Sequence, residues 1–142
     1  MSAPHPYPAH AFRVEIDGLI TVAFNRVLLP TLERDVIRHR DGSDLVDVAH
    51  KLPGLLTVGD CVLEHGTVPT DTSFFQWVTG ASASRRNVSI TLLDASHSPV
   101  LRWLLHDTFA IGLEWSPLDA QHSSALIERL RLAVERVDLQ SA

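Results

Sequence analysis

Short stretches of alternating apolar and polar residues dominate the first third of the chain. The segment FRVEI at 12–16 alternates with the two-residue period of a strand that has one buried face. Asp17-Gly18 is a hairpin-type turn signal, and the run LITVAFNRVLL that follows is rich in β-branched and aromatic residues. This pattern predicts a hairpin whose returning strand is interrupted at Pro30.

A third strand is expected over 32–40, followed by a long polar segment. The alternation of Asp35-Val36-Ile37-Arg38 is imperfect, which indicates a bulge or a face covered by a partner. Residues 41–56 contain Gly42 and Pro53-Gly54, and we interpret them as a polar loop. A loop of this length is expected to have a functional role. Thr57 to His65 is predicted as a fourth strand.

A short helix is expected after residue 70. Thr70 or Asp71 can cap its start, and Gly80 ends it. Two to three turns are too short to persist without packing, so its aromatic side chains are expected to plug the open end of a sheet structure. The apolar face of this helix consists of Phe74, Phe75, Trp77 and Val78.

The next part of the chain predicts a clear hairpin, formed by 87–93 and 100–105. A further strand is expected over Thr108 to Trp115. Repeated short strands with turn signals between them indicate a mainly β protein, built as a two-sheet sandwich or barrel. The residues expected to form the core of the hairpin are Val88, Ile90, Leu92 and Trp103.

Residues 124–137 fit two structures. Leu126, Leu130, Val134 and Val137 recur at helical spacing. The same segment permits a strand in which Leu130, Leu132 and Val134 alternate with Arg131 and Ala133. Periodicity alone favours the helix.

Length and composition indicate one domain spanning 1–142, with residues 1–10 as a flexible N-terminal arm. The chain has 142 residues, of which 45% are apolar, enough for a substantial core. Neither a secretory signal nor a run long enough to span a membrane is expected. The single cysteine fits a reducing compartment, so we expect folding in the cytoplasm. A formal charge of −5 offers no electrostatic reason to bind nucleic acid.

Candidate chemical sites are weak. Cys61 and His65 are spaced for a metal only on a helix, whereas the segment is predicted as a strand that would place them about 13 Å apart. Glu15 and Asp17 share a strand face, as exposed acids commonly do. No nucleophile motif, phosphate loop or dinucleotide fingerprint occurs. We therefore expect no catalytic residue, no metal and no cofactor, and Arg85-Arg86 is interpreted as a solvated or interface turn.

The order of several segments resembles the inner tail-tube proteins of contractile phage tails and related injection systems. The matching pieces, in chain order, are FRVEIDGLITVAF, VIRHRDG, KLPG, VLEHG, FFQW, NVSITLLD, PVLRW and LIERLRL. The resemblance implies a two-sheet β-barrel with one helix, and it favours a strand for 124–137. His97 stands where the family tends to have glycine, at a turn that requires positive φ.

The resemblance also implies a structural role without enzymatic activity. Family members form hexameric rings that stack into a hollow tube, so the implied partners are further copies, the sheath, the baseplate hub or spike, and cargo or DNA in the lumen. The protein would then belong to a virion or a phage-tail-like particle. The 41–56 segment would reach the next ring, and its expected interface residues are Asp41, Gly42, Lys51, Leu52, Pro53 and Gly54.

Two alternatives remain open at this point. Divergent tube proteins can start the tube at the baseplate, where one ring forms and does not extend. From a different class, a monomeric β-barrel could bind a small ligand through Trp77 or Trp103. The second alternative predicts a closed, pocketed monomer.

Overall fold

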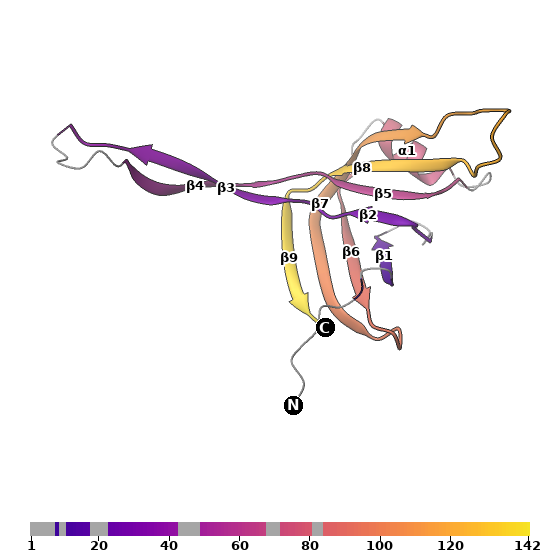
Figure 1. The fold of residues 1–142 in the computed structure, drawn as a ribbon, viewed down its shortest axis with the longest axis horizontal. Helices are drawn as coiled ribbons and strands as arrows, with labels where there is room; N and C mark the ends of the chain where they lie inside the picture. Colours follow the sequence, from indigo (N-terminus) through magenta and orange to yellow (C-terminus); the bar gives the residue numbers. More distant parts are fainter. Residues whose placement is uncertain (1–7, 9–10, 18–22, 43–48, 68–71, 81–83) are drawn as a thin grey trace.

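The computed structural model describes residues 8, 11–17, 23–42, 49–67, 72–80 and 84–142. They form antiparallel β-structure with one short helix, which confirms the expected fold class (Figure 1). The strands and the helix are β1 (Phe12–Ile16), β2 (Arg26–Leu28), β3 (Leu32–His39), β4 (His50–Val58), β5 (Cys61–Gly66), α1 (Ser73–Thr79), β6 (Arg86–Leu93), β7 (Pro99–Trp115), β8 (Ile127–Ala133) and β9 (Arg136–Ser141). Expectations for residues 1–7, 9–10, 18–22, 43–48, 68–71 and 81–83 lie outside this range, including most of the N-terminal arm and the proposed caps Thr70 and Asp71.

The body consists of two antiparallel layers that share the long strand β7. The first half of β7 pairs with β6 and β9, and β1 extends this layer on the far side of β6. The second half pairs with β8, which is followed by β5 and β2. Asp107 has a φ of 52° between the two halves. The two separate strands expected at 100–105 and 108–115 are therefore one strand, because a single residue in the left-handed region lets it turn from one layer into the other.

The pairing of the hairpin expected between the first two strands falls mainly on residues 18–22, which lie outside the described range. β1 pairs with β6, from Phe12 opposite Leu92 to Ile16 opposite Val88, whereas β2 pairs with β5. Of the long run after Gly18, only Arg26–Leu28 is a strand among the described residues. A turn signal in the sequence does not show which strand will be the neighbour, because pairing depends on residues far along the chain.

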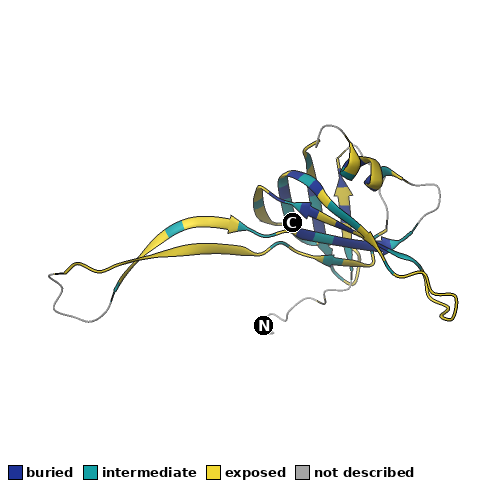
Figure 2. Cartoon of the chain, turned by 90° about the horizontal axis from the view of Figure 1, so that it is seen from above, coloured by how far each residue is buried: buried dark blue, intermediate teal, exposed yellow. Residues whose placement is uncertain are grey.

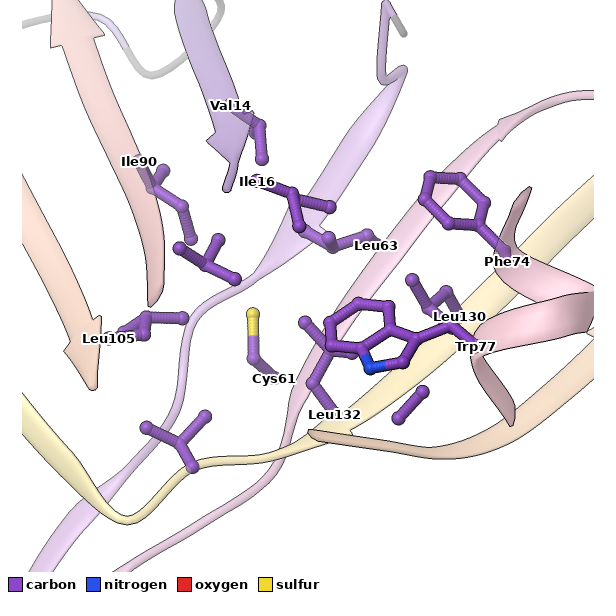
Figure 3. Packing of buried hydrophobic residues seen from close by; sticks show 13 residues of the cluster. Val14, Ile16, Cys61, Leu63, Phe74, Trp77, Ile90, Leu105, Leu130 and Leu132 are labelled. Atoms are coloured by element: carbon purple, nitrogen blue, oxygen red, sulfur yellow. The ribbon is translucent and has the colours of Figure 1, made fainter. Parts of the chain in front are cut away.

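The core lies between the two layers and is closed by α1 (Figure 3). Val88 and Ile90 are buried as expected, while Leu92 and Trp103 are only partly covered. Phe74 and Trp77 of α1 point into the core, and Trp77 Nε1 donates a hydrogen bond to the carbonyl of Ser84 at 2.8 Å. Buried side chains from four strands and from the link between β8 and β9 complete the cluster: Val14, Ile16, Cys61, Leu63, Leu105, Ala110, Leu130, Leu132 and Val134.

The assignment of Phe75 to the core is wrong, because its side chain is 51% exposed. On a helix, residues three and four positions after Phe74 share its face, and these are Trp77 and Val78. Phe75 lies about 100° away from that face. The helix therefore buries one aromatic face and leaves Phe75 in solvent.

The expected loop over 41–56 is wrong in its second half, because His50–Val58 form strand β4 paired with β3. Pro53 and Gly54, which we expected in a polar loop, both lie in the strand beside a register shift opposite Arg34 and Val36. That shift confirms the bulge predicted from the irregular alternation of 35–38. The fourth strand predicted over 57–65 is interrupted at Gly59-Asp60, where β4 ends and β5 begins.

The C-terminal segment is β-structure, which confirms the strand favoured by the family resemblance and makes the helical reading wrong. β8 alternates buried Leu130 and Leu132 with exposed Arg129 and Arg131. β9 follows and pairs with the first half of β7. His97 has a φ of 61° in the turn between β6 and β7, as expected for a position that suits glycine. No described helix is long and apolar enough to cross a membrane.

Candidate assembly surfaces

A two-stranded arm made of β3 and β4 projects away from the body (Figures 1 and 2). Every residue of β3 is exposed, and Gly54 and Val58 alone are partly covered in β4. The arm nevertheless carries large apolar side chains at half exposure or more, up to 80% for Leu55. A lone two-stranded hairpin is marginally stable in water, so these side chains need a partner surface. The exposed apolar residues are Leu32, Val36, Ile37, Leu52, Leu55 and Leu56.

Strand register divides the arm into two faces of different charge. Val36 is paired with Pro53 and Arg38 with Lys51, so these residues share one face with Arg34 and Leu56. Ile37 is paired with Leu52 on the opposite face, which also carries Glu33 and Asp35. One face is thus apolar and basic, and the other is apolar and acidic. We call them the basic face and the acidic face.

The arm joins the body through a narrow two-stranded joint. Leu29-Pro30-Thr31 link β2 to β3, and Gly59-Asp60 link β4 to β5. The amide of Gly59 donates a hydrogen bond to the carbonyl of Thr31 at 2.8 Å. A side chain at Gly59 would overlap the Thr31 hydroxyl, so glycine suits the close approach of the two segments while threonine stands at position 31. This joint fixes the arm as a continuation of β2 and β5.

The layer β7–β8–β5–β2 has open edges on both sides within the described part of the chain. β2 ends the strand order on one side. On the other, residues 109–115 of β7 pair with β8 alone. Unpaired strand edges are templates for pairing with another chain. Trp115, at the β7 edge, is 48% exposed.

Four charged side chains form a row across this layer, on the face turned away from the core. Arg26, Glu64, Arg129 and Glu114 are directly opposite one another on β2, β5, β8 and β7. Arg129 Nε lies 2.6 Å from Glu64 Oε1, and Arg129 Nη1 lies 2.9 Å from Glu114 Oε1. Hydrogen bonds from Arg129 to Glu64 and then Glu114 raise the pKa of its guanidinium. Arg26 Nη1 is 3.8 Å from Glu64 Oε2. We call this row the charged ladder.

A buried polar group lies at the same end of the layer but on its core side. His65 Nε2 is 3.2 Å from Glu128 Oε1, and Trp115 Nε1 donates to Glu128 Oε2 at 2.9 Å. The rings of Phe24 and Phe74 meet the His65 ring edge to face. This arrangement pairs a buried histidine with a carboxylate in an aromatic setting, while His65 Nδ1 is buried without a hydrogen-bond partner among the described residues.

Cys61 and His65, considered above as metal ligands, do not lie side by side. Cys61 and His65 lie on strand β5, as predicted, and Cys61 is fully buried. Burial raises the pKa of the Cys61 thiol to about 12, so it stays protonated and is a poor nucleophile. In the described ranges, no three His, Cys, Asp or Glu side chains come together as metal ligands.

The expected interface residues all belong to the arm. Lys51, Leu52, Pro53 and Gly54 lie in β4, and Asp41-Gly42 follow the outer end of β3. Sequence reasoning missed the exposed apolar residues of β3 and Leu55-Leu56, although the failed alternation over 35–38 was a signal for them. It also missed the charged ladder, whose members are distant in sequence.

The fold, with its projecting arm and open sheet edges, is typical of a structural protein. Residues 8–138 match the family described as T4-like virus tail tube protein gp19, and the chain belongs to this family. It is a tail tube protein of contractile tails or injection systems, a non-enzymatic component of a phage tail or phage-tail-like particle. No curated protein sequence matches it significantly.

Solved structures with this fold come from several contractile systems. A chain of the PVC extracellular contractile injection system, in its extended sheath–tube complex, has a TM-score of 0.87 at 22% identity, over 97% of this chain and 93% of that one. A chain of the anti-feeding prophage baseplate has a TM-score of 0.83 at 25% identity, over 99% and 98% of the two chains. Hcp1 from Flavobacterium johnsoniae has a TM-score of 0.58 at 14% identity, over 92% and 95%.

Proposed function

We propose that the chain forms hexameric rings that stack into the inner tube of a contractile particle. The observation that carries this proposal is the projecting arm, which has exposed apolar residues on both faces and no core of its own. Such an arm is stable only against other subunits. In a head-to-tail ring each interface joins two different surfaces of the same protein, and the arm is one such surface.

The two open sheet edges support closure of a ring. β2 runs antiparallel to the second half of β7, because three antiparallel pairings separate them. The β2 edge of one copy can therefore join the β7 edge of the next in an antiparallel sheet. Six copies with four such strands each, spaced about 4.8 Å apart, would enclose a circle roughly 37 Å across. That opening is wide enough for protein cargo or double-stranded DNA.

Sheath and baseplate proteins are the proposed partners outside the tube. Similar chains occur in a sheath–tube complex and in a baseplate. The protein would fold as a single domain in the cytoplasm before assembly. The baseplate match also supports the alternative that the chain forms the ring that starts the tube. The ligand-binding alternative is weakened, because Trp77 is buried in the core and Trp103 packs against it, partly buried.

Negative-stain electron microscopy, paired with the mass in solution, tests the proposal on the full chain and on an armless variant. Glu33 and Thr57 are cross-strand neighbours, so residues 34–56 can be replaced by an Asn-Gly turn that keeps the joint intact. We expect tubes or rings from the full chain, and no stacks from the armless variant. A full chain that stays at about 16 kDa when concentrated would overturn the ring, and armless stacks would overturn the role of the arm.

A further inference from the structure

We propose that the charged ladder sets the register between neighbouring copies, with Arg26 of one copy placed against Glu114 of the next. This inference rests on the proposed ring, and names the residues that would align its β2 and β7 edges. The ladder alternates in sign across the layer: positive, negative, positive, negative. It therefore ends with an arginine on one open edge and a glutamate on the other.

The two end residues are suited to a partner outside their own subunit. The side chains of Arg26 and Glu114 are 60% and 63% exposed, whereas that of Glu64 inside the ladder is 10% exposed. Arg26 reaches Glu64 with one loose contact of 3.8 Å, so most of its five N–H donors stay available. Glu114 contacts Arg129 through Oε1. Joining two edges would continue the alternation of charge from copy to copy.

The same register brings together two further complementary pairs. In antiparallel pairing, placing Arg26 opposite Glu114 places Val27 opposite Leu113 and Leu28 opposite Gly112. Val27 and Leu113 both face the core side and are partly covered apolar residues. Leu28 is 43% exposed, and its counterpart Gly112 has no side chain. A hollow of about 130 Å³ adjoins Gly112, Glu114 and Arg131. The Arg131 guanidinium lies over Gly112, so Leu28 of the next copy would enter this hollow against the Arg131 side chain.

A shift of two residues in either direction would lose this complementarity. One shift places Leu28 against Glu114, and the other places Arg26 against the side-chain-free Gly112. Each leaves a charge without its partner and an apolar side chain beside a polar one, which costs free energy at an edge that becomes buried. The three pairs therefore specify one register. A surface that combines an ion pair, an apolar contact and a leucine facing a glycine is selective for a second copy of this chain.

A charge-reversal cycle tests the proposal in the full-length protein. Glu114→Lys and Arg26→Glu each place like charges across the proposed interface. We expect each to lower ring formation at least about tenfold, equal to about 1.4 kcal/mol. The double variant restores opposite charges between copies, so we expect it to form rings more readily than either single variant. Within a subunit, the double variant breaks both ladder-end contacts, so recovery can come only from contact between copies.

A second measurement covers the case in which reversal harms folding. Arg26→Lys keeps the charge and supplies an amine that a carbodiimide can join to a touching carboxylate. We expect covalent oligomers, with mass spectrometry locating the bond between position 26 of one copy and Glu114 of another; Leu28→Lys is the off-register control. If the wild type forms rings, absence of that bond in Arg26→Lys, together with no recovery in the double variant, would overturn the register. Wild-type protein that forms no rings would instead overturn the proposed function.

Discussion

At the residue scale, the buried thiol of Cys61 gives a pH prediction. Burial raises its pKa from 9.0 to about 12, so between these values the unfolded chain releases a proton that the folded chain keeps. The stabilising contribution is complete below pH 9 and is lost as pH rises toward 12, by up to about 1.4 kcal/mol per pH unit. Urea unfolding between pH 8 and 11 should show the free energy of unfolding of the wild type falling faster than that of Cys61→Ala. Parallel pH profiles of the two proteins would contradict the assignment.

Single residues were predictable from sequence where local spacing decides their environment. Val88 and Ile90 alternate cleanly and are buried in β6. Phe75 was misassigned because hydrophobicity was considered without helix geometry; the spacing from Phe74 to Trp77 and Val78 already selects one face. His65 and Glu128 could not be paired from sequence, because β5 and β8 become neighbours only in the folded sheet.

At the element scale, the joint between arm and body depends on Gly59. Gly59→Ala would place a methyl group against the Thr31 hydroxyl, and overpacking of this kind costs about 1–3 kcal/mol. We expect a lower thermal midpoint and faster proteolysis within the arm. Thr31→Ala removes the clashing oxygen, so the double variant Thr31→Ala/Gly59→Ala should recover most of the loss. No recovery would show that another constraint at Gly59 dominates.

Elements were predictable where one face of a strand packs on the core. The periodic signal located β1, β6 and the helix, and the family resemblance decided the strands at the C-terminus. The arm was misinterpreted because both of its faces are exposed in a single subunit, so its apolar residues follow no one-sided alternation. Pro53 and Gly54 then suggested a loop, although proline and glycine are tolerated in an edge strand beside a bulge.

At the scale of the whole molecule, the charged ladder could not be predicted from local sequence patterns. Arg129 is 65 residues from Glu64 and 15 from Glu114, and only the folded layer aligns them. The open edges have the same origin, because a strand is an edge only after every other pairing is known. The resemblance indicated assembly, while the folded layer indicates which edges and which register can carry it.

The two faces of the arm lead to a last prediction about the number of subunits that contact it. A hairpin with apolar residues on one face needs one partner, whereas apolar residues on both faces require the arm to lie between two surfaces. Val36→Asp/Leu56→Asp alters the basic face, and Ile37→Asp/Leu52→Asp alters the acidic face. All four side chains are at least half exposed, so each variant should fold as a monomer with an unchanged thermal midpoint.

We expect each pair of substitutions to abolish stacking by itself, because each face would lose its own partner. Sedimentation of the assembled fraction and electron microscopy would measure this, with Ala95→Asp in the exposed turn between β6 and β7 as the matched control. If the pair on one face left tubes intact, that face would be open to solvent in the assembly. The arm would then have a single partner surface. Loss of stacking by both pairs would place it between two neighbouring subunits, as an element that links copies within a ring to copies in the next.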